Sequence, residues 1–266
     1  MMLPVDSMFA LRLMHPKGSL APFVQAIWSA SVSCEASGNV KRWLQGDGCS
    51  GIIFNLGEEI YLDDIKYSAN QIVLPITQQA HSISLPPGSK LCGFQFHPGV
   101  GYSFLGGHCD QAVVAEDHFP SLPYDLRAVA EKVSRASGHY SRMIVLYKWL
   151  SEVTAFFDSS PSWFSQAVKN IESNGLMNTD LPLTQRQVER QFKKRLRMSP
   201  KHYQRVVRVK CAIERLKEMP SLDLAELAIR SGFSDQSHMT REFKKIAQIT
   251  PGEFSRIIAK RLAKDV

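Results

Sequence analysis

The first 120 residues alternate short apolar runs with turn-forming residues, at intervals of about ten positions. Short runs that are rich in Val, Ile and Phe and bounded by Gly, Pro and Asn are typical of β-strands. The runs lie at residues 23–32, 51–56, 60–62, 71–74, 81–85 and 90–96. Several short strands at this spacing predict one β domain, a sandwich or a barrel, over about residues 9–120.

Two apolar segments follow, at residues 124–136 and 141–157, and predict helices. The second segment carries apolar residues on more than one face, which leaves two interpretations open: it packs onto the β domain, or it pairs with its copy in a dimer. A domain boundary is expected at residues 158–162, because Pro161 suits the first turn of a helix and Ser160 can cap it.

The remaining residues have helical periodicity. Residues 162–173 place Phe164, Ala167, Val168 and Ile171 on one face. A longer segment, residues 200–219, carries Tyr203, Val206, Val207, Ile213 and Leu216 and predicts a long connecting helix.

The stretch from Ser231 to Pro251 predicts a tight turn followed by a helix. Gly232 suits the positive φ of a helix C-terminus, and Ser234 is expected to cap the next helix, residues 235–247. A short helix capped by Ser221 is expected before the turn. Helix, glycine turn and helix together are typical of a helix-turn-helix.

A second candidate helix-turn-helix unit lies before the long helix. Thr184 and Gln187 match a capping box, and Val188, Phe192 and Leu196 form the apolar stripe of a helix that ends near Arg197.

The run from Ala228 to Lys244, A-x-x-x-G-F-S-D-Q-S-x-x-T-R-x-F-K, followed by Thr250-Pro251, resembles the C-terminal signature of AraC/XylS-type transcription regulators. The resemblance implies an all-α domain at residues 161–266. In it, two helix-turn-helix units, at about 175–197 and 221–247, are joined by a long helix.

The N-terminal part resembles the cupin-like domains that precede AraC-type DNA-binding domains, through the order of its runs and the motifs Phe96-His-Pro-Gly99 and Tyr102–Gly106. The fold expected is therefore α+β. A cupin-like sandwich or barrel with flanking helices, residues 1–158, serves sensing or dimerisation, with its β part at about 9–120 and its helices at about 122–157.

The chain departs from the family pattern in one place. Only residues 175–183, interrupted by Pro182, precede Thr184, where the family has a fuller scaffold helix. We therefore expect a shortened or irregular scaffold there, and we expect the second recognition helix to carry more of the specificity.

The resemblance also assigns roles to residues. Those expected to face base edges are Arg186, Glu189, Arg190, Gln236, Ser237, His238, Thr240 and Arg241. Arginine can bond guanine bidentately and glutamine can bond adenine. For Glu189 two roles stay open: its carboxylate accepts a hydrogen bond from a cytosine amine, or it only repels phosphate. The expected phosphate contacts are Lys193, Lys194, Arg197, Lys244 and Lys245.

Charge is distributed unevenly along the chain. Residues 1–160 have a formal net charge of −3 and residues 161–266 one of +10. A basic domain of this kind indicates a polyanionic partner. A membrane surface is the weaker alternative, because no helix pairs the basic residues with an aromatic face.

Signals for other classes of protein are weak. The five cysteines are scattered, without a C-x-x-C pair, which favours reduced thiols and no disulfide framework. No signal peptide or long apolar run is apparent, so we expect a cytoplasmic, nucleoid-associated protein.

No enzyme class is indicated. The G-x-G-x-x-G at residues 46–51 precedes a strand rather than a helix, which predicts a turn and not a pyrophosphate site. The spacing of His97, His108, Cys109 and His118 matches no metal-ligand pattern. We expect no catalytic residues, no metal and no cofactor.

The expected function is a DNA-binding transcription regulator, an activator in the family's commoner mode, modulated by a small molecule through the N-terminal domain. Double-stranded DNA, a small-molecule effector and RNA polymerase are the expected partners, and a homodimer stays open. Two alternatives remain. The N-terminal domain is a ligand-free dimerisation or docking module, or it is a cupin-type metalloenzyme.

Overall fold

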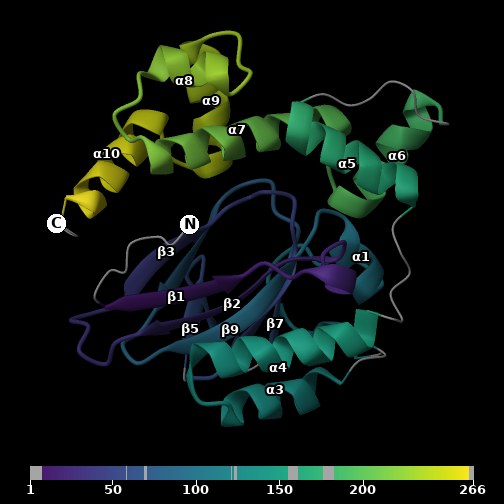
Figure 1. Cartoon of the computed structure of the whole chain (residues 1–266), viewed down its shortest axis with the longest axis vertical. Helices are drawn as coiled ribbons and strands as arrows, with labels where there is room; N and C mark the ends of the chain where they lie inside the picture. The colour runs from purple at the N-terminus through teal and green to yellow at the C-terminus, as the bar shows by residue number, and fades with distance from the viewer. Residues whose placement is uncertain are drawn as a thin grey trace. The chain divides into compact units, whose positions relative to one another are not determined.

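The computed structural model describes residues 8–57, 59–68, 71–120, 122, 125–154, 161–175 and 183–263 (Figure 1). The chain forms two compact units. The first comprises Met1–Leu44, Cys49–Ile76 and His81–Ser159, and the second comprises Gln45–Gly48, Thr77–Ala80 and Ser160–Val266.

The first unit contains two antiparallel sheets. One has the order β1-β2-β9-β4-β7-β10, and the other has the order β3-β8-β5-β6. The first sheet is built from β1 (Phe9–Met14), β2 (Val24–Val32), β9 (Lys90–Phe96), β4 (Gly51–Asn55), β7 (Gln71–Leu74) and β10 (Val113–Val114). The second is built from β3 (Val40–Leu44), β8 (His81–Leu85), β5 (Ile60–Leu62) and β6 (Ile65–Tyr67).

The six-stranded sheet is covered on both faces. One face contributes Ile53, Ile72 and Leu91 to a core shared with Ile60 and Ile83 of the smaller sheet. The opposite face packs its apolar side chains against helices. Every residue of β4 is buried as a result, which explains why its sequence reads as a continuous apolar run rather than an alternating one.

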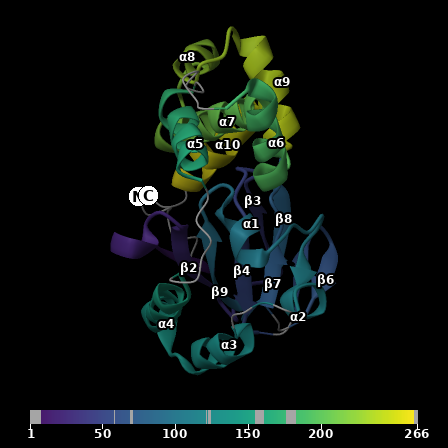
Figure 2. The same cartoon turned by 90° about the vertical axis from the view of Figure 1, so that its right-hand side faces the viewer.

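Helices close the outer face of this sheet. After a 3₁₀ turn (Gly18–Leu20), the unit contains α1 (Val100–Leu105), α2 (Ala115–His118), α3 (Leu126–Arg135) and α4 (Gly138–Val153). Helix α4 packs on β2 and β9, and α3 packs on α4 and β7 (Figures 1 and 2). Phe94 anchors this layer, with ring centroids 5.2 Å from Phe96 and 5.9 Å from Trp149.

The second unit is helical. It contains α5 (Ser162–Asn174), α6 (Gln185–Leu196), α7 (Pro200–Glu218), α8 (Leu224–Arg230), α9 (Gln236–Ala247) and α10 (Pro251–Leu262). Helix α7 contacts each of the other five, so it forms the spine of this unit (Figure 1).

The mixed α/β architecture, with antiparallel sheets before a helical region, confirms the fold class expected from the sequence. All six predicted strand runs form strands. The pattern missed β1, β3, β6 and β10, together with helices α1 and α2. Strands β6 and β10 are only three and two residues long, too short for alternation to show.

Two helix boundaries differ from prediction. Helix α4 begins at Gly138, three residues before the predicted start, and α3 begins at Leu126, where the Asp125 side chain accepts from the N–H of Ala128. The predicted cap Ser160 and the predicted helix end near Phe157 lie outside the described residues. Pro161 itself is the N-cap of α5. Across the part of the chain that is described, no helix is both long and apolar enough to span a lipid bilayer.

One close approach in the sheet generates a testable prediction. A Cβ at Gly93 would clash with the carbonyl oxygen of Ile52 and would lie 2.8 Å from the Trp28 ring. Because a sheet carbonyl cannot move aside, Gly93→Ala should destabilise the β unit by about 1–3 kcal/mol, the usual cost of overpacking.

Tryptophan fluorescence during urea unfolding measures this effect. Gly107→Ala is the matched control, since nothing lies within 4 Å of the Cβ it would add. Equal unfolding midpoints for the two variants would show that the close approach at Gly93 is not a constraint.

Candidate nucleic-acid interface

Helix α6 begins with the capping box predicted from the sequence. Thr184 accepts from the N–H of Gln187, and the Gln187 side chain accepts from the N–H of Thr184 at 2.8 Å. The helix ends at Leu196, where Arg197 adopts a positive φ of 57° as C-cap. Both ends of the helix are therefore fixed by local interactions.

An aromatic cluster holds the inner face of α6. Phe192 lies with its ring centroid 5.0 Å from Phe164 of α5 and 6.3 Å from Tyr203 of α7. The Tyr203 hydroxyl donates to the carboxylate of Glu172 on α5 at 2.9 Å. Val188 and Leu196 complete the buried stripe. The outer face of α6 is thereby presented on a rigid support.

The outer face of α6 is polar, basic and concave. Arg186, Glu189, Arg190 and Lys193 are exposed. A hollow of about 760 Å³ lies along this face; it is lined by Thr184, Arg186, Gln187, Glu189, Arg190, Lys193 and Ser199. Gln185 donates to Glu189 at 3.1 Å, so this carboxylate is partly occupied within the helix.

The turn before α9 confirms the role predicted for Gly232. Its φ is 79°, and its N–H donates to Ile229 while that of Phe233 donates to Ala228, which ends α8. Glycine adopts this positive φ without the steric cost that a Cβ atom would bring.

Two predicted caps are wrong by one or two positions. Asp235, not Ser234, caps α9 by accepting from the N–H of His238 at 2.7 Å. Asp223, not Ser221, caps α8 by accepting from the N–H groups of Ala225 and Glu226. An ionised carboxylate forms a stronger bond to helix N–H groups than a hydroxyl does, and aspartate wins in both places.

Helix α9 separates an apolar face from a polar one. Met239, Phe243 and Ile246 are buried, and Phe243 lies with its ring centroid 6.0 Å from that of Phe254 in α10. Gln236, Ser237 and Arg241 are exposed, with Thr240 half-buried among them. The pattern read from the sequence therefore matches the burial observed.

The expected base-reading residues differ in how free their side chains are. The Thr240 hydroxyl donates to the Gln236 carbonyl at 2.8 Å, and the His238 Nδ1 lies 3.0 Å from the Ser234 hydroxyl. By contrast, no side-chain hydrogen bond or ion pair with another described residue engages Arg186, Arg190, Gln236, Ser237 or Arg241. These five keep their full bonding capacity for a partner.

The expected phosphate-contacting residues are all exposed. Lys193 and Lys194 lie on the last turn of α6 and Arg197 is its C-cap, whereas Lys244 and Lys245 lie on the last turn of α9. Arg195, which lies between them in sequence, is instead buried and covers the Phe164 ring at 5.6 Å, so it belongs to the core.

A polar cluster that the sequence analysis missed connects α7 to α9. Arg205 donates to Glu242 at 3.4 Å and lies 3.4 Å from the His202 ring. Burial, followed by the positive charges of Arg205 and Lys245, lowers the pKa of His202. The pair holds α9 in orientation on α7. In the sequence, the only sign of this cluster is the i,i+3 spacing of His202 and Arg205 within α7, and that spacing is common.

Helix α7 supports both candidate recognition helices: Phe192 of α6 lies against Tyr203, and Glu242 of α9 accepts from Arg205. Figure 1 shows α6 near the start of α7, and α9 crosses α7 where Glu242 accepts from Arg205 at 3.4 Å. A helix of 19 residues is about 28 Å long at 1.5 Å per residue. This length is close to one turn of B-DNA, about 34 Å.

Two further expectations concern segments outside α6 and α9. The predicted irregular scaffold before Thr184 lies largely outside the described residues; Gly175, with a φ of 67°, ends α5 before it. The glycine motif at residues 46–51 leads into β4 and opens no helix, as predicted.

The metal candidates are not brought together. Within the residues that the structure describes, no group of three or more His, Cys, Asp or Glu side chains is placed to hold a metal ion. His108 lies with its ring against that of Tyr102, and His118 with its ring against that of Phe119.

Comparison with known families gives two matches. Residues 179–257 match the model of a helix-turn-helix domain, and residues 12–113 match a domain of unknown function, DUF6597. No curated protein sequence matches the chain.

One solved structure shares the fold over nearly the whole chain. ToxT from Vibrio cholerae superposes with a TM-score of 0.50 at 11% identity, covering 94% of this chain and 98% of ToxT. A second ToxT structure, bound to (E)-4-(8-methylnaphthalen-1-yl)but-3-enoic acid, gives a TM-score of 0.49 at 11% identity and covers 94% and 99% of the two chains. A probable AraC family transcriptional regulator from Rhodopseudomonas palustris gives 0.34 at 19% identity, covering 37% of this chain and 98% of that one.

The cap of α9 generates a prediction for stability. Asp235→Ala should lower the stability of the helical unit, whereas Ser234→Ala, which removes no cap, should lower it much less. The bond from the His238 N–H, then the Ser234 hydroxyl, lowers the pKa of Asp235 in the folded protein. The cap's contribution is therefore complete above the ordinary aspartate pKa, about 3.9, and is lost as the pH falls below it.

Chemical unfolding at neutral and acidic pH, followed by helical circular dichroism, measures both effects. The gap between wild type and Asp235→Ala should narrow as the pH falls below about 4. A gap that persists unchanged at low pH would contradict the carboxylate cap.

Proposed function

We propose that this chain, which carries an AraC-type helix-turn-helix domain, is a transcription regulator that reads two successive major grooves of double-stranded DNA. The observation that carries the proposal is the pair of helices α6 and α9. Each has a buried apolar stripe, an exposed face with unpaired Arg or Gln side chains, and a basic last turn.

The chemistry of the two faces divides the work of binding. Arg186, Arg190, Gln236 and Arg241 supply bidentate groups for base edges, each worth about 1–3 kcal/mol of discrimination. Lysines on the last turns neutralise phosphates and contribute affinity without sequence information. The remaining base-reading candidates, Glu189, Ser237, His238 and Thr240, have fewer free bonding groups or shorter reach and refine the choice of base.

The second reader is proposed to dominate specificity. Helix α9 is oriented by the Asp235 cap and by the Arg205–Glu242 pair. Its free Gln236 and Arg241 lie in the N-terminal half of the helix, the part that contacts base edges in helix-turn-helix proteins.

The N-terminal unit is proposed to sense a small molecule and to change how the DNA domain acts. ToxT, whose fold this chain shares, has been solved with a carboxylic acid bound. Activation through RNA polymerase, a homodimeric state and a location on the nucleoid belong to the same proposal, and no catalytic activity is part of it.

A ligand-free docking role for the N-terminal unit is the second candidate, and one feature favours it. Tyr140 and Ile144 on α4 are 68% and 50% exposed. A thermal-shift screen of metabolites that finds no stabilisation would support docking over sensing.

Arg241→Ala and Lys244→Ala test the division between base and phosphate contacts. Arg241→Ala should reduce the preference for the specific site over random DNA by about 1–3 kcal/mol. Lys244→Ala should weaken binding to all sequences alike and lower the slope of log affinity against log salt by about 1.

Binding to specific and random duplexes across a salt series measures both quantities, after genome-wide mapping has identified the site. An unchanged preference in Arg241→Ala would remove this residue from the base-reading set.

Two double variants test the ranking of the readers. Gln236→Ala with Arg241→Ala should lose more discrimination than Arg186→Ala with Arg190→Ala, because the sequence before α6, residues 175–183, departs from the family's scaffold pattern. The same competition assay compares them. A larger loss from the α6 pair would reverse the ranking while leaving the DNA-binding function intact.

A further inference from the structure

A polar, cationic cluster lies where the first turn of α4 meets the six-stranded sheet. Arg12 of β1 is directly opposite Ser29 of β2 in the register. Ser29 and Ser31 share one face of β2, because side chains alternate along a strand. His139 of α4 contacts both serines, so this is the face that α4 covers.

The hydrogen bonds indicate the form of His139. Its Nδ1 lies 2.9 Å from the Ser29 hydroxyl, and its Nε2 lies 3.3 Å from that of Ser31. Ser29 already donates its proton to the Leu91 carbonyl at 3.2 Å, so it accepts from Nδ1–H. Nε2 of the neutral ring then accepts from Ser31, and only this nitrogen can take up a further proton.

The charges around this histidine are uncompensated. Burial, followed by the positive charges of Arg142 and Arg12, lowers the pKa of His139. No carboxylate contributes to that shift from the described residues. The Nε of Arg142 is buried and has no hydrogen-bond partner in the described part of the chain.

The elements nearest to this histidine add positive charge, and neither β1, β2 and β9 nor the first turn of α4 carries an acidic residue. The first turn of α4 has no acidic residue, and Ser137 forms no side-chain cap bond, which leaves the positive end of the helix dipole open. On β9, Lys90 and Cys92 lie opposite Ser31 and Ser29. Burial raises the pKa of Cys92 to about 12, so this thiol stays neutral.

We propose that Arg12, Ser31, His139 and Arg142 form a binding site for the carboxylate or phosphate group of a small molecule. Two guanidinium groups offer charge-assisted bonds to an oxyanion, and the Ser31 hydroxyl can donate to it once Nε2 of His139 is protonated. These cations are concentrated in the half of the chain whose net charge is −3, so a general affinity for polyanions does not account for them.

The site also couples the anion to a proton. An oxyanion beside Nε2 favours the protonated ring, so binding should raise the pKa of His139 and should strengthen as the pH falls through that pKa. In the regulator proposed above, this anion site would be the effector site. Only that role rests on the proposed function; the binding of the anion does not. Its test contains no DNA, so the two can fail separately.

The test follows the His139 imidazole by NMR in the full chain, with His139→Gln to assign the signals. The probes are inorganic phosphate and hexanoate, each at millimolar concentration against chloride of equal ionic strength. We expect the pKa of His139 to rise with at least one probe. A response to phosphate alone identifies a phosphorylated ligand, and a response to hexanoate alone identifies a carboxylate. Because the signal is local, phosphate on the basic helical unit does not contribute.

Variants connect the response to the cluster. Arg142→Gln should weaken the dissociation constant about tenfold or more, the loss expected for a hydrogen bond to a charged group. Arg142→Lys, which retains the charge, should recover part of the affinity. Lys148→Gln, on the exposed side of the same helix, should leave it unchanged.

Two results would overturn the proposal: a His139 pKa that neither probe moves, or equal affinities for Arg142→Gln and Lys148→Gln. Should Arg142→Gln fail to fold, Arg12→Gln on the half-exposed β1 strand replaces it with the same expected loss.

Discussion

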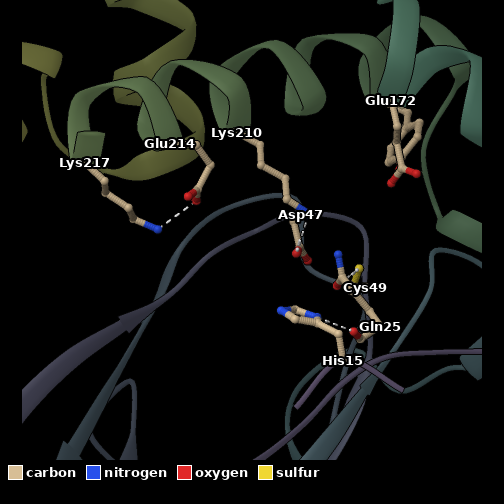
Figure 3. Close-up of polar contacts among 9 residues, drawn as sticks. His15, Gln25, Asp47, Cys49, Glu172, Lys210, Glu214 and Lys217 are labelled. Atoms are coloured by element: carbon tan, nitrogen blue, oxygen red, sulfur yellow. Dashed lines mark hydrogen bonds and ion pairs between the residues drawn. The ribbon is translucent and has the colours of Figure 1, made fainter. Parts of the chain in front are cut away.

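The helical unit depends on the packing of a single helix, α7. Its buried side chains, from Tyr203 near the start to Leu216 near the end, contact the aromatic cluster of α5 and α6 and the apolar stripes of α8, α9 and α10. An ion pair on its exposed side, Lys217 to Glu214 at 2.7 Å, supports the last turn (Figure 3). Both candidate recognition helices therefore rest on one helix.

Polar interactions then set the orientation that packing alone leaves free. A buried stripe can rotate slightly in its groove, but the Thr184–Gln187 box, the Asp235 cap and the Arg205–Glu242 pair each fix one direction. Such bonds contribute about 1 kcal/mol each to stability. Their larger effect here is to hold exposed arginines in place on α6 and α9.

The β unit solves a different problem, the covering of a sheet on both faces. The smaller sheet covers one face and α3 with α4 covers the other, so the middle strands are buried throughout. Some polar contacts lie where this covering ends. His15 bonding to the Gln25 carbonyl at 2.9 Å (Figure 3) is one such edge contact, and the Arg12, His139 and Arg142 cluster is another.

Local patterns in the sequence determined the predicted strand runs, the capping box at Thr184, the glycine turn at Gly232 and the faces of α6 and α9, since each depends on neighbours within one or two turns. Only the tertiary structure decided the rest. It buried Arg195 against Phe164 and brought Ser29 beside His139, 110 positions away in the sequence. Contacts between such distant residues follow from strand register and helix docking, which no local periodicity encodes.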